Sequence, residues 1–208
     1  MLLAALFATT ASATEGIYSD DCVPPPDTYI GQFHARYAQG LVDLTNPNHS
    51  RFTECDSLPT SAAFSVSSTH TFQSLVVVDV SVSSGTPQTM QAPATVTVSV
   101  DFAGIEPGPK RVFNTEMLQL DIAGGTLPPG TMIRESPTLA STGKTTVRDI
   151  GGGMFAIDSF FDIFTELSLD GGQTWFPTES GAGHMELLPS LPTLTRRSTW
   201  GALKMLYR

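Results

Sequence analysis

The chain has 208 residues, of which 40% are hydrophobic and only 15% are charged, and its formal net charge is −9. The apolar content is enough for a sizeable core and argues against wholesale disorder. An acidic surface repels phosphate backbones, so the sequence predicts no nucleic-acid partner. No internal stretch reaches the roughly 18 consecutive apolar residues of a membrane-spanning helix, so we expect no transmembrane segment.

The first residues are typical of a secretory signal. Leu2–Phe7 form an apolar run, and Ala11, Ser12 and Ala13 supply a small-x-small cleavage pattern. We therefore predict that residues 1–13 are a signal peptide, that the mature chain starts at Thr14, and that the protein is secreted or held in the cell envelope. The alternative is a buried N-terminal strand.

The two cysteines, Cys22 and Cys55, are expected to pair if the chain is exported. On the chain-entropy model this disulfide would stabilise the fold by roughly 3–4 kcal/mol. The alternative is two free thiols. Residues 14–70 are interpreted as an N-terminal arm, a short helix and a loop. The helix is predicted over Thr28–Gln39, because Tyr29, Phe33 and Tyr37 recur at a spacing of four residues.

From residue 71 onward the hydrophobic period becomes two. Val78, Val80 and Val82 alternate with Asp79 and Ser81, and similar alternation recurs in later segments. Such alternation is typical of strands with one buried face. We therefore predict an all-β fold, with one or more antiparallel β-sandwiches over residues 71–188. The Gly- and Pro-containing segment at 104–110 is a candidate boundary between two related β-units.

One segment resembles a known local motif. Residues 168–175 read Ser-Leu-Asp-Gly-Gly-Gln-Thr-Trp, which is similar to the Asp-box hairpin of sialidases and many unrelated β-proteins. The carboxylate can accept hydrogen bonds from turn amides, the glycines tolerate positive φ, and the indole can fold against the hairpin. We predict a structural rather than a catalytic role for the motif positions Ser168, Asp170, Gly172, Thr174 and Trp175.

No other pattern indicates chemistry. The histidines His34, His49, His70 and His184 lack the spacing of a metal site, and no nucleophile–histidine order stands out. Calcium at the turn around Asp170 is a weaker alternative, because few hard oxygen ligands surround it in sequence. We expect no catalytic residues, no metal and no cofactor.

The C-terminal residues 189–208 are interpreted as a tail. Within it, Pro192-Thr193-Leu194 and Trp200-Gly201 resemble the PTL-x-x-WG sorting signal of bacterial envelope proteins, with longer spacing and without the apolar span that should follow. Over residues 28–188 the chain also resembles a family of uncharacterised bacterial secreted proteins that often carry such tails. The segments that carry this resemblance are 114–121, 134–138 and 157–166.

The resemblance implies export and a β-rich fold, and it implies no activity. The leading hypothesis is an exported, non-catalytic structural or binding module of the envelope or extracellular space. The alternative is a carbohydrate-binding or carbohydrate-active protein, suggested by the Asp-box and by Trp175. The partner is unknown, with a glycan and an envelope protein as the two candidates.

Overall fold

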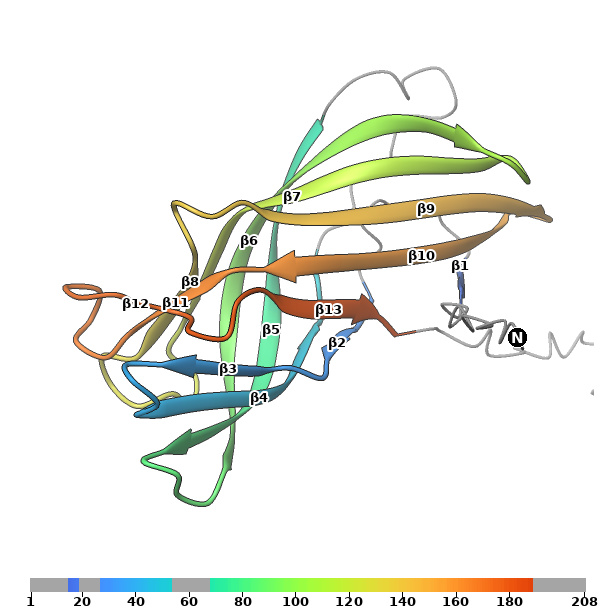
Figure 1. Ribbon diagram of the computed structural model, residues 1–208. Helices are drawn as coiled ribbons and strands as arrows, with labels where there is room; N and C mark the ends of the chain where they lie inside the picture. Colours follow the sequence, from blue (N-terminus) through green and yellow to red (C-terminus); the bar gives the residue numbers. More distant parts are fainter. Residues whose placement is uncertain (1–14, 19–26, 54–67, 189–208) are drawn as a thin grey trace, which may run out of the picture.

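The structure is a computed structural model that describes residues 15–18, 27–53 and 68–188. All regular elements in these ranges are β-strands (Figure 1). They are β1 (Gly16–Tyr18), β2 (Tyr29–Gly31), β3 (His34–Tyr37), β4 (Val42–Ser50), β5 (Ser68–Val82), β6 (Gln88–Glu106), β7 (Lys110–Ala123), β8 (Met132–Glu135), β9 (Ser141–Gly151), β10 (Met154–Ile163), β11 (Thr165–Ser168), β12 (Phe176–Pro177) and β13 (Gly183–Leu187).

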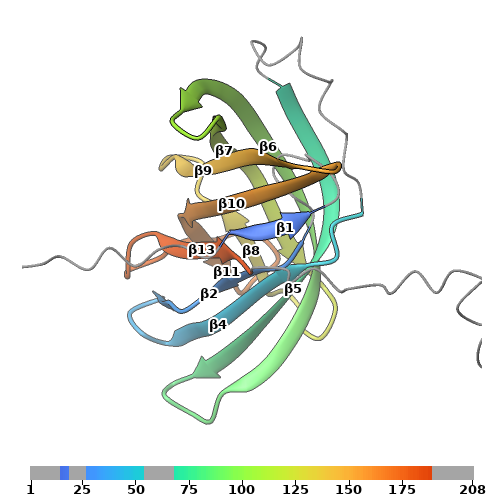
Figure 2. The same cartoon turned by 90° about the vertical axis from the view of Figure 1, so that its right-hand side faces the viewer.

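The strands form a closed antiparallel barrel (Figure 1 and Figure 2). The barrel wall has eight strand positions, and each is hydrogen-bonded to the next. Four positions are the unbroken strands β4, β5, β6 and β7. Each of the other four positions consists of two strands. β2 and β3 both pair with β4, and β8 and β9 both pair with β7. β11 continues the position of β10, and β12 continues the position of β13. The ring closes where Met185 of β13 pairs with Gly31 of β2. β1 pairs with Phe155–Ile157 of β10, on the side opposite β9 and next to the segment that pairs with β13.

The prediction of an all-β fold is confirmed, but the prediction of a sandwich is wrong. A sandwich has two sheets with free edges, whereas here each position of the ring pairs on both sides. Both architectures bury one face of each strand and so produce the same alternation in sequence. The segment at 104–110 lies at the tip of the hairpin between β6 and β7, where Glu106 pairs with Lys110.

The predicted N-terminal helix over Thr28–Gln39 is also wrong. This segment forms β2 and β3, and its buried residues include Tyr29, Ala35 and Tyr37. A spacing of four residues is an even number, so it satisfies the period of a strand as well as one turn of a helix. The aromatic residues that indicated a helix face therefore also share one face of an extended chain.

One half of the barrel interior is filled by aromatic rings. Phe52 lies at centroid distances of 5.9 Å from Tyr29 and 5.1 Å from Phe72, both edge-to-face. Tyr29 makes a similar contact with Phe161 at 5.9 Å. Rings in this arrangement stabilise a core beyond the area they bury. They leave this half of the interior densely packed.

Close approach of strands in this half depends on Gly143. A Cβ at this position would lie 2.2 Å from the carbonyl oxygen of Phe160 and 2.7 Å from Oγ1 of Thr115. The side chain of Thr115 is therefore enclosed between its neighbours, and its Oγ1 is the buried side-chain polar atom without a hydrogen-bond partner in the described part of the chain. A buried hydroxyl without a partner is destabilising.

This enclosure predicts opposite outcomes for two identical substitutions. Thr115→Val should leave the free energy of unfolding unchanged or raise it by up to about 1 kcal/mol, because it removes an unsatisfied hydroxyl at nearly constant volume. Thr145→Val should lower it by about 1–2 kcal/mol, because Oγ1 of Thr145 shares a 2.8 Å hydrogen bond with Ser159 inside the same barrel. Urea denaturation measures both values, and equal losses in the two variants would contradict the account.

Candidate functional site

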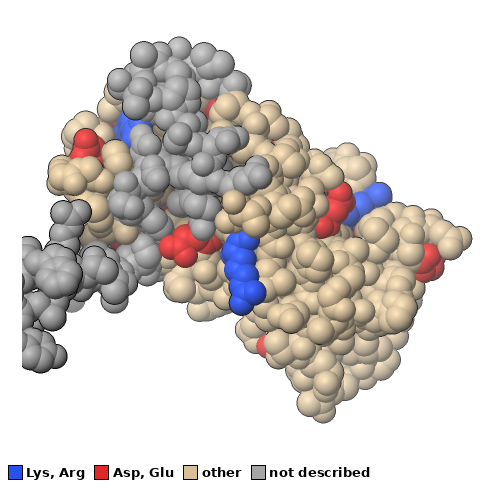
Figure 3. Space-filling view, turned by 180° about the vertical axis from the view of Figure 1, so that it is seen from behind, with Lys and Arg blue, Asp and Glu red and all other residues tan. Residues whose placement is uncertain are grey.

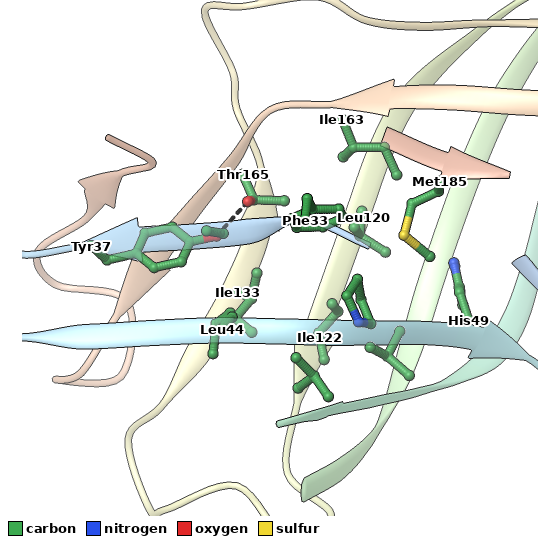
Figure 4. Close-up of a pocket in the computed structure, with 14 residues that line it drawn as sticks. Phe33, Tyr37, Leu44, His49, Leu120, Ile122, Ile133, Ile163, Thr165 and Met185 are labelled. Atoms are coloured by element: carbon green, nitrogen blue, oxygen red, sulfur yellow. Dashed lines mark hydrogen bonds between the residues drawn. The ribbon is translucent and has the colours of Figure 1, made fainter. Parts of the chain in front are cut away.

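The other half of the barrel interior contains an apolar cavity of about 60 Å³. Figure 4 shows the side chains that line this space, among them Tyr37, Leu44 and Ile163. The lining residues come from the segment between β2 and β3 and from β3, β4, β5, β7, β8, β10, β11 and β13: Phe33, Ala35, Tyr37, Leu44, Pro47, His49, Val76, Val78, Leu120, Ile122, Ile133, Ile163, Thr165 and Met185.

β6 contributes none of the described lining residues. Its inward residues at this end of the barrel are Ala92 and Ala94, which pair with Val76 and Ile122 of the neighbouring strands. Val76 and Ile122 themselves line the cavity.

Two glycines lie next to Phe33, which lines the cavity. Gly31 of β2 and Gly183 of β13 lie beneath the ring of Phe33, and a Cβ on either residue would come within 2.8 Å of that ring. Phe33 and Thr165 are the lining residues that are only partly buried. Their side of the cavity is therefore the one nearest to solvent.

Three lining side chains carry polar groups. The hydroxyls of Tyr37 and Thr165 share a hydrogen bond of 2.5 Å, drawn as a dashed line in Figure 4. Burial raises the pKa of Tyr37 to about 12, so the phenol is neutral at physiological pH. His49 is bonded through Nε2 to Oγ of Ser74 at 2.6 Å. Burial lowers the pKa of His49 to about 4, so the imidazole is also neutral.

The hydroxyl of Ser74 connects His49 to the backbone. Its Oγ lies 2.6 Å from Nε2 of His49 and 3.4 Å from the carbonyl oxygen of Ala94. Which atom donates in the shorter contact depends on the tautomer of His49. Among the described residues, no group hydrogen-bonds to Nδ1. The cavity is thus an apolar space with one neutral imidazole in its wall.

The five Asp-box positions lie elsewhere, in the hairpin that joins β11 to β12. Asp170 accepts hydrogen bonds through Oδ1 from the amides of Gln173 and Thr174, at 3.0 and 2.9 Å, and through Oδ2 from the hydroxyl of Thr174 at 2.6 Å. Oγ of Ser168 accepts from the amide of Gly172 at 2.9 Å and donates to Asp170. The hydroxyl of Thr174, followed by these amides, lowers the pKa of Asp170 to about 2.

The indole of Trp175 packs outside the barrel. Its Nε1 donates to the carbonyl of Gly172 at 3.0 Å, and the guanidinium carbon of Arg134 lies 4.0 Å from the ring centroid. Arg134 also donates twice to Glu166, at 2.7 and 3.0 Å, across the paired strands β8 and β11. The loop is thereby attached to the barrel wall, and none of its five motif residues lines the cavity.

Other parts of the described chain bear on metal binding, membrane insertion and surface charge. In the described ranges, no group of three or more His, Cys, Asp or Glu side chains is placed to hold a metal ion. Those ranges also contain no helix with the length and apolarity needed to cross a membrane. On the face seen in Figure 3, acidic and basic side chains are dispersed rather than gathered. Cys22 and Cys55 lie outside the described residues, as do the expected signal peptide and C-terminal tail.

Comparisons of the chain with protein-family profiles, with curated proteins and with solved structures find no match in any of the three. The expected membership of a family of secreted bacterial proteins therefore stays a prediction. The cavity was not predicted from the sequence, although the alternation placed Val76 and Val78 on one strand face together. No single segment of the sequence carries a signal of it, because its lining comes from many strands.

The lowered pKa of His49 predicts a specific loss of stability in acid. An unfolded histidine has a pKa near 6.5 and the folded one is at about 4, so the unfolded state binds the extra proton as pH falls between these values. The contribution is present above the unfolded pKa and should decrease by about 2 kcal/mol between about pH 7 and about pH 5. His49→Gln should therefore lose less stability than the wild type over this range, as measured by urea denaturation.

His184→Gln is the matched control for that measurement. Partial burial lowers the pKa of His184, but its hydrogen bonds to Asp162 at 2.6 Å and Glu186 at 3.2 Å outweigh this effect and the net shift is upward. A raised pKa stabilises the fold at low pH and the benefit is lost as pH rises. His184→Gln should therefore lose more stability than the wild type on acidification. If the two variants change in the same direction, the assignment of a neutral buried His49 is wrong.

The hydrogen bonds of Asp170 predict that the loop depends on its carboxylate. Asp170→Ala should lower the melting temperature, because it leaves the amides of Gln173 and Thr174 without their acceptor. Asp101→Ala, at an exposed position on β6, is the control and should change it little. Differential scanning calorimetry compares them, and an unchanged melting temperature for Asp170→Ala would refute the structural role.

Proposed function

We propose that this chain is an exported, non-catalytic binding module that holds a small, uncharged apolar group inside its barrel. The observation that carries the proposal is the cavity itself, whose lining is apolar apart from Tyr37, His49 and Thr165. Barrels with eight strand positions are wide enough to hold one small ligand among their interior side chains. The predicted export of the chain sets the compartment in which such a ligand would be met.

The size of the cavity limits the ligand. A water-sized group needs about 10–15 Å³ of such a volume, so 60 Å³ admits about four to six non-hydrogen atoms. This is the size of a single ring or a short branched chain, which can be a free molecule or the end of a larger one. For a ligand of this size, we expect a dissociation constant between about 1 µM and about 1 mM.

A binding role is favoured over catalysis by the chemistry of the wall. Among the described residues, the lining contains no carboxylate, amine or thiol, and the hydroxyls of Tyr37 and Thr165 are bonded to each other. Nucleophilic or general acid–base catalysis needs a nucleophile and a base within hydrogen-bond reach of one another and of the substrate. His49 is bonded through Nε2 to Ser74, whose Oγ also lies within hydrogen-bond distance of a backbone carbonyl.

The carbohydrate-binding alternative has less support from the geometry. It depended on an aromatic side chain that could stack on a sugar, and Trp175 was the candidate. The guanidinium of Arg134 lies over its ring at 4.0 Å, and its Nε1 already donates to Gly172. One ring face and the polar edge of the indole are thus engaged within the protein.

Binding of benzene to the full chain tests the proposal. Benzene should raise the melting temperature in a dose-dependent way, since a ligand that binds only the folded state stabilises it. Ala35→Leu adds three carbon atoms in the cavity wall and should weaken binding at least tenfold, an order-of-magnitude expectation for a small filled pocket. Ala123→Leu makes the same change on the outward face of β7 and should bind like the wild type.

Isothermal titration calorimetry on the three proteins gives the dissociation constants. The absence of any benzene-dependent stabilisation of the wild type would overturn the proposal. Equal affinities in Ala35→Leu and the wild type would show that the ligand binds elsewhere. A glycan screen that gave binding abolished by Trp175→Ala, in a folded variant, would favour the carbohydrate alternative instead.

A further inference from the structure

The barrel wall beside the cavity contains a seam between β3 and the loop that joins β12 to β13. β3 pairs with β4 along its whole length, but on its other side it has no strand ladder in the described part of the chain. The contacts across this seam are individual hydrogen bonds. The amide of Glu179 donates to the carbonyl of Arg36 at 2.8 Å, and the amide of Arg36 donates to Oγ of Ser180 at 3.1 Å. A stretch of wall held in this way opens more easily than a strand ladder.

Phe33 lies at the junction between this seam and the cavity. It belongs to the segment 32–33, which joins β2 to β3 outside both strands, and its side chain is among those that line the cavity (Figure 4). It is only partly buried, whereas every other lining residue apart from Thr165 is buried. Phe33 therefore borders both the cavity and solvent, and its backbone is not part of a strand.

The ring of Phe33 rests against two glycines. A Cβ on Gly183 would lie 2.5, 2.7 and 2.7 Å from three ring atoms, and a Cβ on Gly31 would lie 2.8 Å from two of them. On β13, residue 183 is buried and alternates with exposed residues, so it is an inward position without a side chain of its own. The ring occupies the space that a side chain there would fill. Packing alone holds it, because the ring carries no polar atom, and a rotation about its Cα–Cβ bond moves it without breaking a strand ladder.

We propose that Phe33 is the gate of the cavity: the ligand enters and leaves through the seam when this ring turns away from Gly31 and Gly183. The inference rests on the proposed function, because a gate has a role only if the cavity binds a ligand. The competing route is the end of the barrel, where the loop between β7 and β8 places the buried side chain of Leu127 in the core. Leu127 does not line the cavity, so shortening its side chain loosens only that route.

Exchange of fluorobenzene, measured by ¹⁹F NMR on the full chain, gives the association and dissociation rate constants. In Phe33→Ala both should be at least about tenfold faster than in the wild type, because a closed gate limits entry and exit alike. A lining residue that contributes only contacts would change dissociation and leave association unchanged, so the association rate identifies a gate. Leu127→Ala is the control, and its association rate should stay within about twofold of the wild type.

Gly183→Ala tests the gate without removing the ring. The three atoms nearest to the new methyl group all belong to Phe33, so the ring must move while the rest of the wall stays in place. The backbone of residue 183 lies outside the left-handed region, so alanine introduces no strain of its own. This variant should also accelerate association, by about threefold or more, and it keeps the test valid if Phe33→Ala does not fold.

A measurement on the wild type needs no substitution. Aromatic ¹³C relaxation dispersion gives the rate at which the ring of Phe33 opens in the free protein. If the ring is the gate, the observed rate of fluorobenzene binding should not exceed this opening rate at any ligand concentration. Binding that is faster than ring opening would show that the ligand uses another route.

The outcomes keep the gate and the proposed function apart. If fluorobenzene binds the wild type but association is not accelerated in Phe33→Ala and Gly183→Ala, the gate is wrong and the cavity still binds. Acceleration in Leu127→Ala instead would place the entrance at the barrel end. If fluorobenzene does not bind the wild type, the proposed function fails and the gate fails with it. Faster association in Phe33→Ala and Gly183→Ala, with Leu127→Ala unchanged, supports both.

Discussion

Closure of the ring between β13 and β2 is the interaction on which the other features depend. Three register pairs join these strands: Met185 with Gly31, Glu186 with Ile30, and Leu187 with Tyr29. With them in place each position of the barrel is paired on both sides over part of its length, so the ring has no continuous open edge. Closure also fixes the circumference and therefore the interior volume. The side chains must fill that volume, because the backbone cannot contract around them.

The two halves of the interior meet this requirement differently. Aromatic rings fill the half around Phe52 and Phe161, and strand contact there is close enough that only glycine fits at position 143. In the other half the inward side chains, His49 among them, surround a cavity. The closed ring keeps its width past the aromatic half, and the side chains of the second half do not fill the space. The same closure therefore accounts for both the packed core and the space within it.

The sequence allowed the strand class and many inward residues to be predicted, because alternation such as that of Val76, Val78 and Val80 directly reflects a half-buried strand. It did not distinguish a barrel from a sandwich, because that difference lies in the pairing of Met185 with Gly31, which are far apart in the chain. The spacing of Tyr29, Phe33 and Tyr37 fitted a helix and a strand equally, and tertiary pairing with β4 decided it. The cavity could not be predicted because it is the part of the barrel's interior volume that the inward side chains leave unfilled. No single segment determines that remainder.

The order in which the barrel positions follow one another has a consequence for biosynthesis. The hairpins from β4 to β7 join residues close in sequence, whereas the closing pair Leu187–Tyr29 spans 187 − 29 = 158 residues. Local pairs form early and distant ones late, because the entropy of loop closure must be offset first. While a ribosome is still making the chain, the meander can assemble but the ring stays open until β13 has been synthesised. During that interval β2 and β10 are unpaired edges, and a chaperone that covers strand edges would protect the nascent protein at the stage when it is most prone to aggregate.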